Sequence, residues 1–562
     1  MSQTADSPRL SALDVGVFGA MLASSAAIGC YFGLSKGGQR SALDYLMGGR
    51  QMSMLPVALS LVASFISGIS IMGDPAEVYR HGTQYWTIVL SSYLASCVVS
   101  LVYAPLYIKL QLNSCYQYLK MRFNESVRKM ASALFVISQF LYIPIVIYAP
   151  ALALSQVTGL NVHVITPVIS AICIFYTTIG GLRAVVWTDT LQTCLMMMAM
   201  VAVFAMGVAR VGGWEHVWQA AERGGRLEFF NMDPNPLERH TFWTVLLGQF
   251  VYQLAWCATS QGMVQRYLAV PDLRTARWCL ACFAFGMTAV KWLSVATGLL
   301  LYASYENCDP ISSQRVSRQD QILPLYVLET AGHIPGLSGL FVAGVFSAAL
   351  SSMSTGLNAL SGVLVEDLFA RWIPKEGRFG AALWLRVAAL STGVVCVVLV
   401  LIVEHLGGVL QVALSLGSIT SGTMLGLFTM GMFCPRANSK GALIGSLASL
   451  ILNGGIVFAT QGALAQGTLR HSFLPLSTDL CPENTTTIIL PTEPVLETWP
   501  LLKLSYMYYS LVGAILVPLV GLPVSWISGG RHRKMSPDLF SPFVHRWLTP
   551  EDQQCDLKLD EK

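Results

Sequence analysis

Apolar segments that are long enough to cross a lipid bilayer recur along nearly the whole of this 562-residue chain. Hydrophobic residues make up 54% of the sequence and charged residues only 12%, whereas soluble proteins carry about 25% charged residues. Inside a bilayer a segment must satisfy its own backbone hydrogen bonds, so runs of this kind form helices. The sequence therefore predicts an all-α protein whose surroundings are the lipid bilayer.

We expect thirteen membrane-spanning helices, each about twenty residues long. They lie at residues 13–34, 54–73, 84–108, 131–153, 163–180, 184–209, 241–263, 277–304, 337–358, 383–404, 408–432, 441–462 and 504–528. With an odd number of spans, the two chain ends face opposite sides. If the N-terminus is outside, 24 of the 35 lysines and arginines fall in the inner loops and the C-terminal tail. Because inner loops are enriched in these residues, we expect an extracellular N-terminus and a cytoplasmic C-terminus.

The sequence excludes several function classes. No basic run with interleaved aromatic residues suggests a nucleic-acid partner, and no pairing of a nucleophile with a base suggests an enzyme. The sequence gives no indication of oligomeric state. Cys308 and Cys481 fall in loops that this topology places outside, so from location alone we expect them to form a disulfide.

Residues 341–369, FVAGVFSAALSSMSTGLNALSGVLVEDLF, are apolar yet crowded with small and hydroxylated side chains. Ala348, Ser351 and Ser352 are spaced i, i+3, i+4 and share one helix face. Two hydroxyls and a carbonyl on that face supply part of an oxygen cage for a hard cation such as sodium. Small residues also allow two helices to pack closely in lipid. The stretch alone leaves both interpretations open.

Two predicted spans are candidates for a helix broken at mid-membrane. Residues 54–73 are rich in serine and glycine, and residues 241–263 are interrupted by glycine, serine and glutamine. Broken helices at corresponding positions of two halves are typical of a transporter binding site, because the break frees backbone carbonyls toward a cavity. The alternative is a straight helix with polar packing.

Lys291 lies in the middle of a predicted span, where a cation is costly. It could reach the bilayer surface, pair inside the bundle, or anchor an anionic substrate.

The chain resembles the sodium:solute symporter family, in the branch that holds the monocarboxylate, multivitamin and iodide cotransporters. The resemblance covers nearly the whole chain, from DYLMGGR at 44–50 to the last span. The motifs that carry it are LPVALSLVASFIS…PAEVYRHG at 55–82, IYAPALALSQVTG at 147–159, GGLRAVVWTDTLQ at 180–192, QGMVQRYL at 261–268 and NPLERHTFW at 235–243. The resemblance implies a leucine-transporter-type fold of two inverted five-helix repeats.

That fold implies six regions along the chain. They are an extracellular N-terminus with the first peripheral helix and a cytoplasmic loop (1–53), the first repeat (54–211), an extracellular loop (212–240), the second repeat (241–435), two peripheral helices with an extracellular glycosylated loop (436–528), and a cytoplasmic tail (529–562).

The resemblance also implies two sites for sodium ions, which are the cofactors we expect. The first takes the carbonyls of Ala63, Ile66 and Ala348 and the hydroxyls of Ser351 and Ser352. The second takes Ser64, Asp189, Gln192 and Gln261. Asp189 has an alternative role, because Thr188-Asp189 also has the chemistry of a helix N-terminal cap.

The substrate is expected between the two broken helices. Sugar-carrying members of the family have asparagine where this chain has Phe65, and histidine or glutamine where it has Ser70. The pocket implied here is more apolar and suits a short organic anion better than a sugar. Its expected residues are Phe65, Ser70, Met72, Tyr252 and Trp256, with Lys291 as the possible anchor.

We therefore expect a multi-pass plasma-membrane symporter that imports a small organic anion with sodium by alternating access. A monocarboxylate is the first choice, and a multivitamin substrate (biotin or pantothenate) or iodide stays open. A sugar or polyol is disfavoured by Phe65 and Ser70. A non-transporting sensor is disfavoured by the intact sodium ligands.

The topology makes a prediction about glycosylation. Asn484 and Asn124 both begin an N-x-[ST] sequon, but only Asn484 falls in an expected outer loop. Asn484→Gln should collapse the glycosylated band on a gel, and Asn124→Gln should leave it unchanged. A shift that appears only with Asn124→Gln would reverse the orientation.

Overall fold

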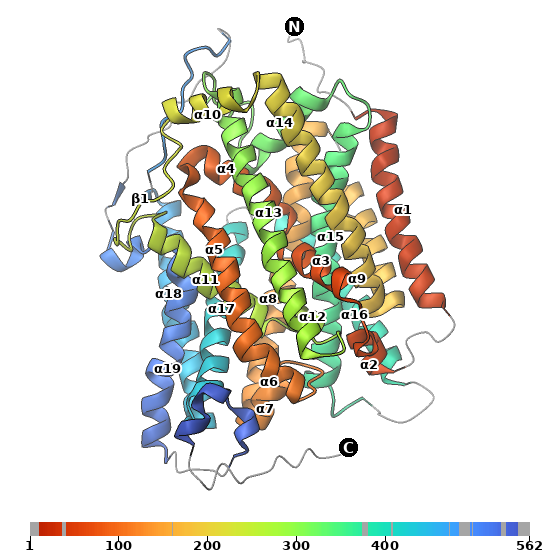
Figure 1. Cartoon of the computed structure of the whole chain (residues 1–562), viewed down its shortest axis with the longest axis vertical. Coiled ribbons are helices and arrows are strands. Elements are labelled where there is room, and N and C mark those ends of the chain that lie inside the picture. Colours follow the sequence, from red (N-terminus) through yellow and green to blue (C-terminus); the bar gives the residue numbers. More distant parts are fainter. Residues whose placement is uncertain are drawn as a thin grey trace.

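The computed structural model describes residues 10–35, 41–159, 161–373, 380–405, 409–470, 472–482, 495–496, 498–529 and 535–548. These residues form a bundle of helices (Figure 1). The strands in the described part of the chain are two residues each, β1 (Leu469–Arg470) and β2 (Val495–Leu496), and they pair antiparallel.

All thirteen predicted spans coincide with helices. The helices are α1 (Ala12–Leu34), α3 (Met54–Phe65) with α4 (Gly68–His81), α5 (Ile88–Val98) continuing into α6 (Ala104–Lys109), α8 (Glu125–Thr158), α9 (Val162–Val211), α11 (Phe242–Thr259) with α12 (Gln261–Tyr267), α13 (Leu273–Tyr305), α15 (Leu337–Val363), α16 (Ala381–His405), α17 (Val409–Phe433), α18 (Ser439–Ala465) and α19 (Tyr509–Ile527). The 50-residue α9 holds two predicted spans, which meet at Gly181, a non-helical residue with φ 50° and ψ −152°.

Within the described residues, nine helices are long and apolar enough to span a membrane, and the bent pair α3 and α4 makes a tenth. Short helices cover the two ends of the bundle (Figure 1). α10 (Trp214–Arg223) and α14 (Ile322–Ala331) lie at the end where α1 begins, whereas α2 (Ala42–Met47) and α7 (Gln117–Arg122) lie at the other. The last described segment packs on α7, where Tyr118 donates to the carbonyl of Leu539. The first and last described segments therefore lie at opposite ends of the bundle, as an odd number of spans requires.

Helix α15, which contains the small-residue stretch, is the centre of the bundle. It packs against α1, α3, α4, α8, α9 and α16. In the most apolar part of α15, 94% of the residues are buried, against 22% in α1. The small residues make this possible: a Cβ at Gly356 would lie 2.6 Å from Cδ1 of Ile143 in α8. Close packing and a polar face therefore occur in the same helix.

Two arginines counted among the inner loops lie inside the protein instead. Arg122 and Arg266 are each 1% exposed. Arg122 donates to the carbonyls of Gly431, Cys434 and Ala437 at the end of α17, where a cation favours the helix C-terminus. Both arginines were counted with the inner loops, and both are buried within the protein.

The sequons differ in how far the structure describes them. Asn124 caps α8, and its side-chain oxygen accepts a hydrogen bond from the backbone N–H of Val127. Asn484 lies outside the described residues.

Cys308 and Cys481 form a disulfide with a Cα–Cα distance of 5.0 Å. It lies near α10, because Glu306, two residues before Cys308, pairs with Arg223 of α10. We predict that thiol labelling of the intact protein under denaturing conditions leaves both cysteines unmodified unless a reductant is added first. Cys308→Ser should make Cys481 reactive, and Cys481→Ser should do the same for Cys308. Labelling of both without reduction would contradict the pairing.

Candidate functional site

The chain between α3 and α4 is a break in a membrane-spanning helix. Ile66 is extended, with φ −88° and ψ 119°, and the two helices are bent by 62°. The side chain of Ser67 caps α4 by accepting a hydrogen bond from the N–H of Ser70. In the described part of the chain, the carbonyls of Ala63 and Ile66 accept no hydrogen bond. The break therefore frees oxygen atoms inside the protein.

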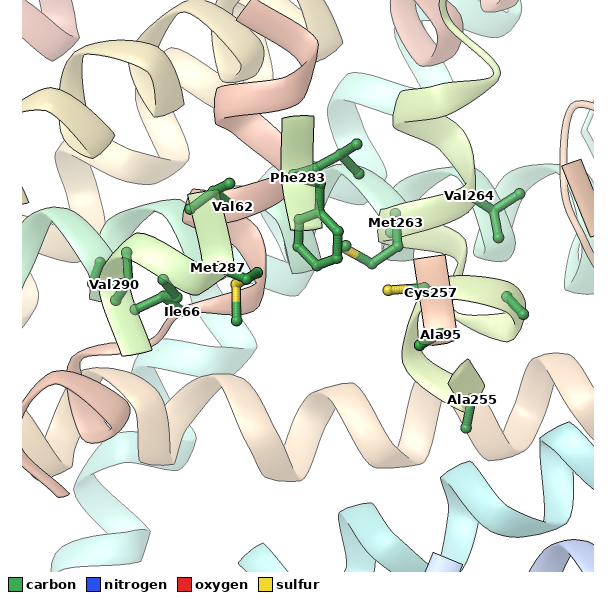
Figure 2. Packing of buried hydrophobic residues seen from close by; sticks show 14 of the residues in the cluster. Val62, Ile66, Ala95, Ala255, Cys257, Met263, Val264, Phe283, Met287 and Val290 are labelled. Carbon is green, nitrogen blue, oxygen red and sulfur yellow. The ribbon is translucent and has the colours of Figure 1, made fainter. Parts of the chain in front are cut away.

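Apolar packing against α13 holds the broken segment in place. Figure 2 shows Ile66 beside Met287 and Val290 of α13, and Val62 on the same side of the break. Ile66 and Met287 are 1% and 0% exposed. Side chains from α3 thus fill the space toward α13 while the backbone carbonyls stay unpaired.

Helix α15 runs across the other side of the break. A Cβ at Gly68 would lie 3.1 Å from the carbonyl oxygen of Val345, so glycine permits this close approach. Farther along, the hydroxyl of Thr355 donates to the hydroxyl of Ser64 over 2.9 Å. These two contacts bracket the part of α15 that holds Ala348, Ser351 and Ser352.

The hydroxyls of Ser351 and Ser352 are buried and make no hydrogen bond to any described residue. Their polar neighbours include Asp189 for Ser351 and Tyr142 for Ser352. Buried polar groups normally find partners, so two orphaned hydroxyls on the helix that packs against the break call for an explanation. Neutral oxygens are ligands for a hard cation, and the five predicted residues fit that donor set.

The second predicted sodium site is only partly assembled. Asp189 is fully buried, and its Oδ2 accepts hydrogen bonds from Ser60 at 2.6 Å and from Arg266 at 2.9 Å. Arg266 also donates to Thr355 and to the carbonyl of Gly262. A guanidinium thus supplies the positive charge beside this carboxylate, which excludes a capping role for Asp189 as its main interaction.

Two of the other three expected ligands of this second site are engaged with other groups. The amide of Gln261 is engaged at both ends, accepting from the N–H of Cys115 and donating to the carbonyl of Asn113, so it is not available beside Asp189. Ser64 bonds to Thr355 and to its own helix. Gln192 is buried with both amide atoms unpartnered in the described part of the chain.

Ser60 and Arg266, which both donate to Asp189, were not predicted from the sequence as residues of this second site. Ser60 stands one helical turn before Ser64 in the serine-rich span. The other predicted broken span is divided at Ser260 into α11 and α12, and Arg266 follows this break by about two turns. A cation so close to a broken helix was the available signal.

A cavity of about 260 Å³ lies beside the break. Its lining includes five of the six expected pocket residues, which are Phe65, Ser70, Tyr252, Trp256 and Lys291. Met72 does not line it and is fully buried in the hydrophobic core. Two residues along a helix correspond to a rotation of about 200°, so Met72 faces away from the side that Ser70 shares with the cavity.

Lys291 lies on the cavity wall and pairs with Asp74 of α4. Its Nζ is 2.6 Å from Oδ2 of Asp74, and the hydroxyl of Tyr85 donates to Oδ1 over 3.1 Å. The side chains of Lys291 and Asp74 are 6% and 13% exposed. Lys291 was predicted at the pocket from the sequence, whereas its partner Asp74 was not.

The cavity and the orphaned serines are neighbours. Tyr142 and Trp256 line the cavity and also a smaller space that reaches Ser64, Ser352 and Thr355. The rings of Tyr142 and Trp256 would thus lie between a group that occupies the cavity and this smaller space.

Comparisons with known proteins identify the family of this chain. The model of the sodium:solute symporter family matches residues 45–449. Sodium-coupled monocarboxylate transporter 1 of Homo sapiens is 37% identical over 544 residues, covering 93% of this chain and 88% of the relative. The sodium-dependent multivitamin transporter of Oryctolagus cuniculus is 36% identical over 548 residues, covering 96% and 86%.

A solved structure also shares the fold. A Na⁺-coupled sialic acid symporter, in a substrate-bound outward-open state, aligns with a TM-score of 0.72 at 24% sequence identity over 92% of this chain and 98% of its own. The leucine-transporter-type fold expected from the motifs is therefore confirmed. The relatives are transporters and not enzymes. The chain belongs to the sodium:solute symporter family.

Proposed function

We propose that this protein couples sodium entry to the import of a small monocarboxylate. The observation that carries the proposal is the pair of orphaned hydroxyls, Ser351 and Ser352, on the helix that packs against the α3–α4 break with its unpaired carbonyls. The substrate would occupy the neighbouring cavity, in which Lys291 supplies the positive charge. The names of the relatives point to the same chemistry.

Sodium at the break would stabilise one arrangement of α3, α4 and α15. Because Tyr142 and Trp256 touch both spaces, the position of these rings would depend on whether the ion is bound. An ion and a substrate that favour the same arrangement raise each other's affinity, which is the thermodynamic basis of coupling. One sodium that enters down a potential of about 100 mV releases about 2.3 kcal/mol for this work.

We propose only one sodium site for the arrangement described here. Arg266 already neutralises Asp189, and Gln261 is engaged elsewhere. Of the second set of four residues, only Oδ1 of Asp189 and the amide of Gln192 are without a partner among the described residues. The cost of burying Asp189 is met by this guanidinium.

We place the protein in the plasma membrane with its N-terminus outside. The lysine and arginine distribution supports this orientation. The disulfide between Cys308 and Cys481 supports it too, because disulfides persist on the oxidising side of the membrane.

A vitamin substrate is the second candidate, favoured by the likeness to a multivitamin transporter. The cavity volume disfavours a vitamin, because 260 Å³ is below the roughly 300–1,000 Å³ of sites that bind drug-sized ligands. Uptake in cells without endogenous activity separates the candidates. We expect sodium-dependent uptake of labelled lactate or propionate and none of biotin or glucose; the reverse pattern would contradict the proposal.

The serine hydroxyls give the sharpest prediction. Ser351→Ala and Ser352→Ala each remove one of five oxygens and keep a good helix former of similar size. Both variants should therefore reach the surface, while the sodium concentration for half-maximal uptake rises by at least about tenfold, or about 1.4 kcal/mol. Substrate affinity should recover at high sodium, since the two bindings are linked.

Ser354→Ala is the matched control for these variants. Ser354 is buried in the same helix but donates to the carbonyl of Ser351. Its loss should change the sodium dependence far less. If both Ser351→Ala and Ser352→Ala reach the membrane with the sodium dependence of the natural protein, the hydroxyls serve packing and the proposed site is wrong.

A further inference from the structure

The Lys291–Asp74 pair makes the cavity electrically neutral, which is unexpected in a site for an anion. Lys291 comes from α13 and Asp74 from α4, so the pair joins two elements across one wall. Asp74 lies one helical turn beyond Ser70, on the side of α4 that lines the cavity. A substrate carboxylate that approaches Lys291 must therefore also approach Asp74.

Both members of the pair keep unused hydrogen-bonding capacity. A lysine ammonium has three N–H donors, and Asp74 is the hydrogen-bond partner that the structure gives Lys291 among the described residues. An ionised carboxylate offers about four acceptor positions, of which Lys291 and Tyr85 take two. The pair can thus accept one further anion and one further donor without coming apart.

A monocarboxylate without a hydrogen-bond donor can use the free N–H groups of Lys291 but not the free acceptor positions of Asp74. It can accept a second N–H of Lys291, but its negative charge then lies beside that of Asp74, and two neighbouring carboxylates repel each other. A donor attached to the carbon next to the substrate carboxylate removes this conflict by donating to Asp74. The substrate would then bridge the pair, with one end on each charge.

We propose that Asp74 is a specificity-determining residue, and that the cavity selects monocarboxylates with a hydrogen-bond donor at carbon 2. This inference rests on the proposed function and names the substrate class for it. A 2-hydroxyl and a 2-ammonium group both supply the donor. A 2-oxo group supplies only an acceptor and therefore faces the repulsion of Asp74.

Five acids of three carbons test the proposal by sodium-dependent uptake and mutual competition. Lactate carries a 2-hydroxyl, alanine a 2-ammonium, pyruvate a 2-oxo group and propionate no substituent, whereas 3-hydroxypropionate carries its donor one carbon too far away. We expect lactate, alanine or both to half-saturate at concentrations at least about tenfold lower than the other three, or about 1.4 kcal/mol. Which of the two prevails identifies the donor as a hydroxyl or an ammonium.

Asp74→Asn should abolish this discrimination. The amide keeps the size of the side chain but removes the negative charge, so propionate and pyruvate should gain affinity and approach lactate and alanine. Lys291→Met should weaken all five acids and leave the sodium dependence nearly unchanged. The matched control is Asp538→Asn, which removes the carboxylate from a lysine–aspartate pair outside the cavity, Lys109–Asp538; it should keep the order of the five acids.

Each outcome decides the question. Surface labelling reports whether Asp74→Asn reaches the membrane; if it does not, the order of the acids in the natural protein decides alone. Equal half-saturation by all five acids would overturn the role of Asp74 and leave the proposed function standing. Failure of all five to enter with sodium would contradict the proposed function itself.

Discussion

The meeting of a broken helix with α15 is the constraint on which the rest of this structure depends. The break between α3 and α4 leaves backbone oxygens unpaired inside the bundle, and such groups are costly unless something binds them. Small residues permit the close approach of the two elements. At Gly68 of α4, a Cβ would lie 3.1 Å from the carbonyl oxygen of Val345 in α15. The same stretch of α15 contributes Ser351 and Ser352. Close packing and the proposed sodium site thus depend on one sequence pattern.

Buried charges around this centre are arranged in pairs. Arg266 forms an ion pair with Asp189, and Lys291 forms an ion pair with Asp74 beside the cavity. A charge inside a membrane protein is expensive alone, and each of these groups lies beside a partner of opposite sign. The two pairs differ in what surrounds them. The guanidinium of Arg266 donates to four protein groups, whereas the ammonium of Lys291 borders a cavity and can bind something else.

Much of this could be predicted from the sequence, because hydropathy and small-residue spacing are local properties. The thirteen spans, the break near Ile66 and the shared face of Ser351 and Ser352 all follow from such patterns. The partners of buried charges could not be predicted in the same way. Asp74 with Lys291 is a contact across 217 positions, and Arg266 reaches Asp189 across 77. Met72 was predicted in the pocket because it is only two residues from Ser70 along the chain. The helical rotation between the two residues turns Met72 away from the cavity.

Hydrogen exchange of the purified protein in sodium and in potassium tests the central claim most directly. An ion that binds the break stabilises the closed backbone there, since a ligand that prefers the folded state opposes local opening. Peptides that cover residues 63–70 and 345–356 should exchange more slowly in sodium, while peptides from α18, which packs against α17 and α19, should be unaffected. Equal exchange of the two central segments in both ions would contradict a sodium site at the break.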